Sequence, residues 1–498
     1  MIHPLIEQKN DCVILRHPEQ IPGGTIPAIP SKSHAHRLLI AAGLSDTCQE
    51  IICPSTSKDI DATAECLRQI GIRIQKKDRG FLIDGIRRKE TCLREPLSQG
   101  NDVSSGPAVL HVGESGSTLR FLLPVLGALG IPADLHMEGR LPGRPLSPLY
   151  EELTAHGMTL SPQGSNPLHV TGQLHAGEYR IDGGVSSQYI TGLLFALPLL
   201  NEDSRLVITG HLESRPYVNI TLGVLKTFGI KIRETLRPGD GIATVFDIPG
   251  GGHFHCPSDG ARSDGNSMVP RLIVEGDWSN AAFFLAAGAL LDSPVTVTGC
   301  DPASPQGDKA ILQILREFGA EVRIQETAPA PGDAAASSDR RHTAITVSGG
   351  PLHGINIDAA DIPDLVPVLS VIAACAEGTT VIRNIQRLRI KESDRVATVT
   401  EMLTALGTDC SSTQSELRIE GQRSLSGGSV SSHNDHRIAM AAAIASFRAT
   451  GPVEIRDPMA VNKSYPGFYE DLAKLLGAVI PPAPCRTQPR ISHLHSGY

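Results

Sequence analysis

The sequence predicts a two-domain α/β protein that repeats one helix-and-strand unit six times. The chain has 498 residues, which is too long for one ordinary hydrophobic core, so at least two domains are expected. Six segments have the pattern of a helix that ends in glycine and leads into a β-like run, and they recur roughly 70 to 90 residues apart. The glycines are Gly71, Gly157, Gly229, Gly319, Gly407 and Gly477.

Each of these glycines is expected to take the left-handed backbone conformation that ends a helix. One or two such endings would be ordinary in any α/β protein, whereas six at a near-regular spacing indicate an internal repeat. Turn-rich residues at 250–265 and 274–280 separate the third copy from the fourth, so we place the domain crossover there. Residues 327–341 are low in complexity and are predicted to be a flexible insertion, and residues 481–498 are predicted to be a loose tail.

Composition excludes several classes of protein. A net charge of −8 and an aromatic content of 4% argue against nucleic acid as the main partner. No stretch is apolar for the roughly 18 residues that a membrane span needs, and the start of the chain lacks the features of a signal peptide, so we expect a cytoplasmic protein without a membrane partner. Ten cysteines without a CxxC pair predict reduced thiols rather than a zinc or disulfide framework.

Short cation-bearing loops are the main functional signal. A run of charges is ordinarily a solvated helix face, but several such segments in one acidic chain indicate a site assembled from loops around a small anionic ligand. The segments are SKSHAHR at 31–37, GRLPGRP at 139–145, RIKESDR at 389–395, NDHR at 434–437 and NKSYP at 462–466.

Three predicted helices begin with hydroxyl side chains, at residues 31–37, 113–124 and 183–195. Backbone N–H groups at such helix starts collect anions, although plain capping would explain each start taken alone. The second of these segments is not a Walker A loop, because it lacks the Gly-Lys-Ser/Thr ending of that motif. Together with Lys32, Ser33 and Arg37, the three starts predict a group of phosphate-binding loops.

Metal and nucleophilic chemistry are disfavoured. His34 and His36 form an HxH pair, as do His253 and His255, but two residues apart on a helix start the rings point in different directions. No GxSxG elbow is present. We therefore expect no metal and no cofactor, and acid/base chemistry between anionic substrates.

In this order along the chain, from about Pro30 to Glu470, the segments resemble those of the EPSP synthase family, the enolpyruvyl transferases that act on shikimate 3-phosphate. The motifs that carry the resemblance are SKS with a downstream arginine, the glycine-serine loop before Arg120, GRP, DGGVSSQ, SRPY, VEGD, IPD, RIKESDR, NDHR and NKSYP. The resemblance implies a two-domain inside-out α/β barrel, with three βαβαββ repeats in each domain and the active site in the interdomain cleft. It also implies an upper domain of 31–273 and a discontinuous lower domain of 1–30 and 274–480.

The resemblance further implies the reaction: transfer of the enolpyruvyl group of phosphoenolpyruvate to the 5-hydroxyl of shikimate 3-phosphate, with release of phosphate, in aromatic amino acid (chorismate) biosynthesis. A monomer that needs only these two small-molecule partners is expected, and glyphosate is expected to compete at the phosphoenolpyruvate pocket. Catalysis is implied for Asp364, which contacts the attacking hydroxyl, for Glu392, which exchanges a proton with the methylene, and for Lys32, which bridges both substrates. Glu392 poses a tension, since nearby cations favour its carboxylate while a proton donor near pH 7 needs a raised pKa, which burial and substrate anions could supply.

Substrate contacts are implied for two overlapping sets of residues. Shikimate 3-phosphate is expected at Lys32, Ser33, Arg37, Ser186, Ser187, Gln188, Ser214, Tyr217, Asp364 and Lys391. Phosphoenolpyruvate is expected at Lys32, Gly116, Arg144, Gln188, Arg395, His436, Arg437 and Lys463. Because the cations come from both halves, we expect them to repel one another and to keep an unliganded cleft open.

Three residues depart from the pattern of some family members: Glu114 and Arg387 stand where others carry asparagine, and Phe121 where others carry proline. One alternative is the sister enzyme that acts on UDP-N-acetylglucosamine, whose family carries a lysine-asparagine pair near its start and usually a loop cysteine. Here the pair is Lys32 and Ser33, and no cysteine lies between positions 92 and 256. A second alternative is a non-catalytic phosphate-binding or RNA-end-processing protein built from similar repeats. Such a protein would not need the carboxylates Asp364 and Glu392 together with the four cations Arg144, Arg395, Arg437 and Lys463.

Overall fold

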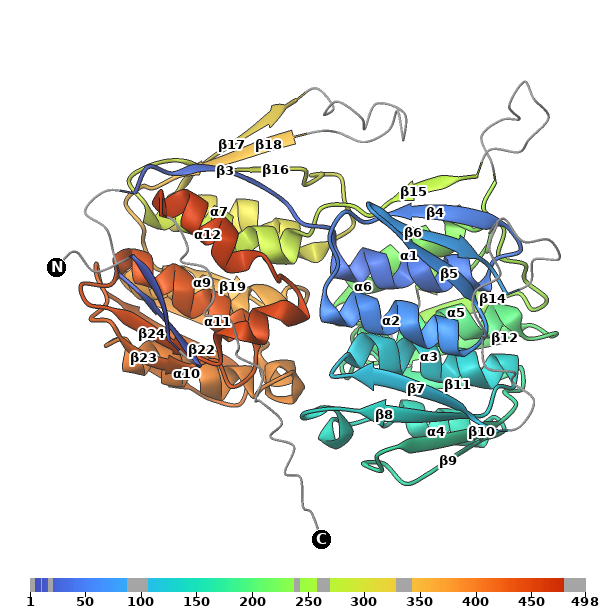
Figure 1. Cartoon of the computed structure of the whole chain (residues 1–498). Coiled ribbons are helices and arrows are strands. Elements are labelled where there is room, and N and C mark those ends of the chain that lie inside the picture. Colours follow the sequence, from blue (N-terminus) through green and yellow to red (C-terminus); the bar gives the residue numbers. More distant parts are fainter. Residues whose placement is uncertain are drawn as a thin grey trace, which may run out of the picture.

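The computed structural model describes residues 5–9, 11–16, 21–86, 106–236, 242–257, 269–327 and 343–478. These residues form six four-stranded sheets and the helices that pack against them. Figure 1 shows two groups of elements side by side, one from the blue to green part of the chain and one from the yellow to red part. Two short N-terminal strands lie with the red elements of the second group. Among the described residues, no helix combines the length and the apolar character needed to cross a membrane.

One unit shows the pattern that all six sheets share. Its chain order is strand, helix, strand, helix, strand, strand, and its first two strands run parallel while the last two add antiparallel. The sheet order is first, second, fourth, third. The elements are β7 (Ala108–Gly113), α3 (Gly116–Leu129), β8 (Ala133–Met137), α4 (Leu149–Ala155), β9 (Met158–Leu160) and β10 (Leu168–Gly172).

Two further units are continuous in sequence. In the first group the elements are β11 (Glu178–Asp182), α5 (Ser187–Ala196), β12 (Ser204–Thr209), α6 (Arg215–Thr227), β13 (Arg233–Leu236) and β14 (Ile242–Ile248). In the second group they are β19 (Asn356–Asp358), α9 (Val366–Cys375), β20 (Gly378–Arg383), α10 (Arg395–Ala405), β21 (Asp409–Ser412) and β22 (Glu416–Gly421).

Two more units exchange their first strands, and this exchange joins the two groups. The unit of α1 (Lys32–Leu44), β4 (Cys48–Ile52), α2 (Lys58–Gln69), β5 (Arg73–Lys77) and β6 (Gly80–Asp84) takes β15 (Arg271–Ile273) beside β4. The unit of α7 (Trp278–Leu290), β16 (Val295–Thr298), α8 (Ile311–Phe318), β17 (Glu321–Glu326) and β18 (Thr343–Ser348) takes β3 (Gly24–Pro27) beside β16. The chain thus passes twice between the groups, and the two passages touch where Pro30 bridges to Gly276.

The last unit is completed by the N-terminal hairpin. It contains β23 (Gly428–Ser431), α11 (His436–Ala445), β24 (Val453–Arg456) and α12 (Phe468–Leu476), and β2 (Cys12–Leu15) pairs antiparallel with β24. β1 (Ile6–Lys9) forms the edge. The hairpin therefore fills the two positions that strands following the second helix fill in the other units.

The predicted helix ends are confirmed. All six glycines have positive φ angles, between 60° and 107°, and they follow α2, α4, α6, α8, α10 and α12. After five of them the chain enters a strand, as predicted. Beyond Ala478, which follows Gly477, the chain lies outside the described residues.

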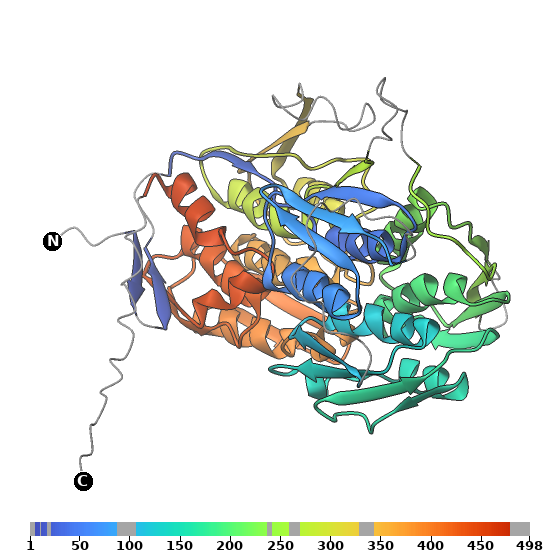
Figure 2. The same cartoon turned by 45° about the vertical axis from the view of Figure 1, so that its right-hand side comes forward.

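Helices α1, α3, α5, α7, α9 and α11 lie inside the two groups, with the sheets around them (Figure 2). Every residue of α7 is buried, which is the character of a helix enclosed on all sides. One hydrophobic cluster draws its buried residues from 35–274 and the other from 6–26 and 278–476. The two-domain, inside-out α/β architecture is thus confirmed.

The predicted insertion at 327–341 lies outside the described residues except for Thr327, and the predicted tail at 481–498 lies outside them entirely. Among the described residues, seven cysteines carry free thiols, of which five are buried. Cys48 is disulfide-bonded, so the expectation of reduced thiols throughout is wrong at this position.

Candidate active site

A cavity between the two groups brings together nearly all the predicted site residues. From the first group it is lined by Lys32, Ser33, Arg37, Gly116, Arg144, Ser186, Ser187, Gln188, Ser214 and Tyr217. From the second group it is lined by Asp364, Lys391, Glu392, Arg395, His436 and Arg437. We refer to these two surfaces as the upper wall and the lower wall. Lys463 is the one predicted site residue that lies elsewhere, in an adjoining groove.

The upper wall is made by the starts of internal helices, and the capping hydroxyls precede the residues that face the cavity. Ser31 caps α1, Ser115 caps α3 and Ser186 caps α5, each by accepting a hydrogen bond from a backbone N–H. Ser33, Ser117 and Ser187 line the cavity one or two residues further on. At α1 and α3 the capping hydroxyl and the hydroxyl that lines the cavity thus belong to different residues, whereas Ser186 both caps α5 and lines the cavity. The N-terminal ends of three helix dipoles add positive potential to this wall.

Two upper-wall arginines, Arg37 and Arg120, donate to neutral oxygens. Arg37 donates from Nε to Thr221 Oγ1 at 2.8 Å, from Nη1 to the carbonyl of Ser33 at 2.6 Å and from Nη2 to the carbonyl of Tyr217 at 3.0 Å. Arg120 donates to Gln188 Oε1 at 3.0 Å and to the carbonyl of Pro145 at 3.1 Å. Burial lowers the pKa of Arg37 to about 9 and that of Arg120 to about 10, so both remain cationic at neutral pH.

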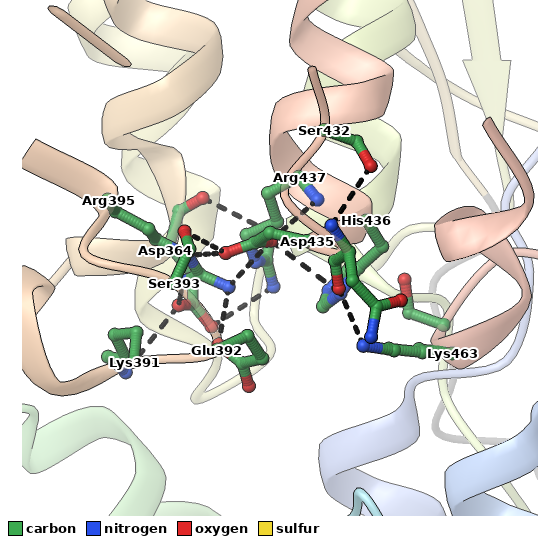
Figure 3. A network of polar contacts seen from close by, with 12 residues as sticks. Asp364, Lys391, Glu392, Ser393, Arg395, Ser432, Asp435, His436, Arg437 and Lys463 are labelled. Atoms are coloured by element: carbon green, nitrogen blue, oxygen red, sulfur yellow. Dashed lines mark hydrogen bonds and ion pairs between the residues drawn. The ribbon is translucent and has the colours of Figure 1, made fainter. Parts of the chain in front are cut away.

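The lower wall is organised around Arg395, whose side chain is only 1% exposed (Figure 3). Its guanidinium donates to Asp364 Oδ1 at 2.7 Å, to Glu392 Oε2 at 2.7 Å and to Asp435 Oδ2 at 2.9 Å. Arg437 donates to the other oxygen of Asp364 at 3.0 Å. One buried cation therefore fixes both predicted catalytic carboxylates, and Asp435, the cap of α11, supports it from behind.

Both carboxylates that are predicted to be catalytic are held ionised. Burial raises the pKa of Asp364, but Arg437, Lys391 and Arg395 outweigh that effect and hold it well below its usual range. Burial likewise raises the pKa of Glu392, and Arg395 and Arg144 outweigh it. Burial thus acts in the expected direction on the pKa of Glu392 but does not by itself raise it above the usual range, and the expected contribution of substrate anions stays a prediction.

Opposite charges connect the two walls. Tyr217 donates to Asp364 Oδ2 at 3.1 Å, and Arg144 Nη1 lies 3.8 Å from Glu392 Oε1. Arg387 donates to Ser214 Oγ at 2.8 Å and lies 3.3 Å from Glu213 Oε2. Carboxylates thus face the cations across the cleft, so the mutual repulsion expected from the cations alone does not hold the walls apart in this structure.

Sequence reasoning missed two members of this site. Lys32 Nζ forms an ion pair with Asp59 Oδ2 at 2.9 Å. Burial lowers the pKa of Lys32, but Asp59 and Glu392 outweigh it and raise the pKa overall. Arg120 also lines the cavity, whereas in the sequence it only marks the end of the glycine-serine loop. An acidic residue in the first turn of α2 is ordinary, so Asp59 gave no distinguishing signal.

The three residues that depart from the family pattern all lie at the site. Phe121 lines the cavity, and the guanidinium carbon of Arg37 lies 4.9 Å from its ring centroid, which is a cation–π distance. Arg387 makes the cross-cleft contacts described above. Glu114 pairs with Lys463 in the adjoining groove, with 2.7 Å between Oε2 and Nζ.

The HxH pair on α1 divides between two partners, as predicted. His34 Nδ1 accepts from the backbone N–H of Glu275 at 3.1 Å, and His36 Nδ1 lies 2.7 Å from Thr63 Oγ1. In the described part of the chain, no three histidine, cysteine, aspartate or glutamate side chains are grouped so as to hold a metal ion.

Comparisons with known proteins agree on one family. A family model described as EPSP synthase (3-phosphoshikimate 1-carboxyvinyltransferase) matches residues 18–472. The 3-phosphoshikimate 1-carboxyvinyltransferase of Clostridium kluyveri is 38% identical over 92% of this chain and 96% of the relative, and that of Clostridium novyi is 37% identical with the same coverage. The EPSP synthase structure from Acinetobacter baumannii superposes with a TM-score of 0.71 at 24% identity, covering 94% of this chain and 99% of that one, which shows the shared fold.

Proposed function

This chain belongs to the EPSP synthase family, and we propose that the cavity between its two walls is the active site of the family reaction. The enzyme transfers the carboxyvinyl group of phosphoenolpyruvate to the 5-hydroxyl of shikimate 3-phosphate and releases phosphate, a step in aromatic amino acid biosynthesis. The observation that carries the site assignment is the pair of carboxylates, Asp364 and Glu392, held by the single buried guanidinium of Arg395.

Shikimate 3-phosphate binds on the upper wall. Hydroxyls at the starts of α1, α5 and α6 and the guanidinium of Arg37 hold its phosphate and carboxylate, and Lys32 stands between the two substrates. Support comes from the neutral partners of Arg37, because a cation without a carboxylate partner keeps its attraction for an incoming anion. The hydroxyls are those of Ser33, Ser186, Ser187 and Ser214, joined by Gln188, Tyr217 and Lys391.

Phosphoenolpyruvate binds between the walls. It carries roughly two and a half to three negative charges near neutral pH, so several cations are needed. Arg144 approaches from the upper wall, Arg395 and Arg437 from the lower wall, and Lys463 from the groove. His436 is buried, and its ring nitrogens make no hydrogen bond to any described residue, which leaves them for the substrate.

The two carboxylates divide the acid/base work. Asp364, ionised and 3.1 Å from the Tyr217 hydroxyl, accepts the proton of the attacking 5-hydroxyl. Glu392 delivers a proton to the methylene carbon as the hydroxyl oxygen bonds to C2, which gives a tetrahedral intermediate with a methyl group. The carboxylate of Glu392 then takes a proton back from that methyl group as the bond from C2 to the phosphate oxygen breaks, so phosphate leaves and the carbon–carbon double bond forms again. Because cations hold Glu392 ionised in the free enzyme, the charges of bound phosphoenolpyruvate must raise its pKa before it donates.

The domain boundaries that fit this function are 31–273 for the upper domain and 1–30 with 274–480 for the lower domain. The two separate hydrophobic clusters support this division. We further propose that the enzyme works as a cytoplasmic monomer without a nucleic acid partner, and light scattering of the purified protein tests the monomer.

Phosphate release with each acceptor in turn tests the function. We expect release only when shikimate 3-phosphate and phosphoenolpyruvate are both present, and no change in rate with excess EDTA. Release with UDP-N-acetylglucosamine would assign the sister activity instead. A rate that is lost in EDTA and restored by zinc or magnesium would refute the metal-free mechanism.

A further inference from the structure

Glu114 is a carboxylate at the cleft to which the reaction as described gives no role. It follows β7 in the first group, where it faces Lys463 of the second group. We propose that Glu114 is a positioning residue: with Asn434 it fixes the ammonium of Lys463 for phosphoenolpyruvate and clamps the two domains together beside the cavity. This inference rests on the proposed function.

The contacts form a closed ring of three residues, which includes the side chains of Glu114 and Lys463 and both the side chain and the backbone carbonyl of Asn434. Lys463 Nζ donates to Glu114 Oε2 at 2.7 Å and to the carbonyl of Asn434 at 2.6 Å. The side-chain amide of Asn434 donates to both carboxylate oxygens of Glu114, at 3.0 and 3.2 Å. The Lys463 side chain is only 11% exposed. An ammonium has three protons, and two are used here, so its position is fixed while one proton is left for a substrate.

The backbone around the ring is built to make it. His433 and Asn434 are both non-glycine residues with left-handed φ angles, 50° and 56°. Their N–H groups donate to Ser431 Oγ and Ser432 Oγ, which hold the turn in place. On the opposite side, a Cβ at Gly139 would lie 2.6 Å from Glu114 Cδ, so only glycine leaves room for the carboxylate. Strained backbone that its surroundings hold in place is typical of functional sites.

The ring stands next to the substrate cavity. It lines a groove that shares Asp59 with the cavity, and Asp59 pairs with Lys32 at 2.9 Å. The groove that Lys463 lines therefore meets the cavity at the carboxylate partner of Lys32, the lysine proposed to touch both substrates. A cation already held in place binds an anion without first losing side-chain freedom, which improves affinity.

The ring also links the domains. Glu114 precedes α3 of the upper domain, whereas Asn434 precedes α11 and Lys463 ends the short helix η7 (Pro458–Lys463) of the lower domain. All its hydrogen bonds to Glu114 cross the cleft, so the ring forms only when the domains are as close as in this structure. Placement of Lys463 is thereby coupled to closure.

Glu114→Gln tests the proposal, with Glu138→Gln as the control. Glu138 is an exposed carboxylate that lines the same groove, and among the described residues it makes no ion pair with Lys463. We expect Glu114→Gln to raise the KM for phosphoenolpyruvate about tenfold and to change kcat and the KM for shikimate 3-phosphate by less than about twofold, since a fixed cation contributes binding rather than chemistry. Glu138→Gln should match the wild type.

Lys463→Met and the double variant show whether Glu114 acts through Lys463. We expect Glu114→Gln to have no further effect on the KM for phosphoenolpyruvate once Lys463 is Met, whereas a general structural defect would persist. A lower KM in Glu114→Gln would mean that the carboxylate competes with the substrate and would overturn the proposal. Kinetics that match those of Glu138→Gln would also overturn it.

The proposed function and the clamp fail in different ways. A wild-type protein that releases no phosphate from the two substrates refutes the function. In that case the unfolding free energies of the wild type, both single variants and the double variant measure the coupling between Glu114 and Lys463, and additive losses would refute the clamp.

Discussion

The two walls of the cleft use arginine in opposite ways. Arg37 and Arg120 of the upper wall donate to hydroxyls, an amide and carbonyls, and burial lowers their pKa values. Burial also disfavours the charge of Arg395 on the lower wall, but Asp435, Glu392 and Asp364 outweigh it and raise its pKa well above the usual range. Arg37 and Arg120 therefore keep their positive charge for an anion, while Arg395 is neutralised in advance by the lower-wall carboxylates that it keeps ionised.

This difference predicts the order in which the two substrates bind. An anion reaching the upper wall displaces neutral partners, whereas an anion reaching the lower wall must compete with carboxylates already in place. Shikimate 3-phosphate should therefore bind first, and phosphoenolpyruvate should bind better once the first substrate is present.

The largest effect is expected from substitution of the two lower-wall carboxylates that are proposed to carry the acid/base chemistry. Asp364→Asn and Glu392→Gln should each lower kcat by about 10²- to 10⁴-fold, because general acid/base catalysis contributes on that order. Each KM should change by less than about threefold. Steady-state phosphate release measures both constants. A variant that keeps wild-type kcat would lose its assigned catalytic role.

The next effect contrasts stability between the walls. Arg395→Met should lower the free energy of unfolding by about 3 to 5 kcal/mol, because it leaves the fully buried carboxylate of Asp435 without its cation. Arg37→Met should cost clearly less, because only hydroxyls and carbonyls lose a donor. Urea denaturation of both variants provides the measurement, and equal losses would contradict the contrast.

A smaller effect is expected where the upper wall meets phosphoenolpyruvate. A Cβ at Gly116 would lie 2.5 Å from Arg120 Nη1 and 2.9 Å from Arg144 Nη1, so Gly116→Ala must displace both guanidinium groups. We expect the KM for phosphoenolpyruvate to rise about tenfold and inhibition by glyphosate to weaken, with the KM for shikimate 3-phosphate little changed. Equal glyphosate inhibition constants in the two proteins would remove the steric argument.

The smallest effect concerns a carboxyl behind the lower wall. Asp308 accepts from Ser279, which accepts from Arg437, and burial and then the charge of Asp364 raise the pKa of Asp308 to about 7. Because this pKa is raised, the folded state binds a proton that the unfolded state has already released. The contribution of Asp308 to the stability of the folded protein is therefore lost as pH rises from about 4 to 7. The wild type should lose on the order of 1 kcal/mol per pH unit relative to Asp308→Asn in the steepest part. Parallel stability curves for the two proteins would refute the raised pKa.

Local signals in the sequence predicted much of this architecture. A helix that ends in glycine is encoded within a few residues, which is why all six endings are confirmed. The loops that build the walls could also be identified, since cations and hydroxyls at helix starts are unusual in an otherwise acidic chain. Where each loop sits in space was available only through the resemblance to a family.

Pairings between distant residues could not be predicted in the same way. Glu114 and Lys463 are 349 positions apart, and Arg387 and Ser214 are 173 apart. The partners of a cation also decide its behaviour: the sequence lists Arg37 and Arg395 as similar cations, and the structure gives one neutral partners and the other three carboxylates. The pKa of Glu392 depends on those partners, so its direction could not be derived from the sequence.

The pairing of the N-terminal hairpin determines the order in which the two halves can complete their sheets during synthesis. The upper half needs nothing beyond β15, so its sheets can be complete once residues 271–273 have left the ribosome. The lower half can complete its last sheet only after β24 (Val453–Arg456) has been made, because β2 is synthesised long before this partner. Until then one edge of β2 stays unpaired, and a nascent chain stalled before β24 should carry a folded upper half and an unfinished lower half.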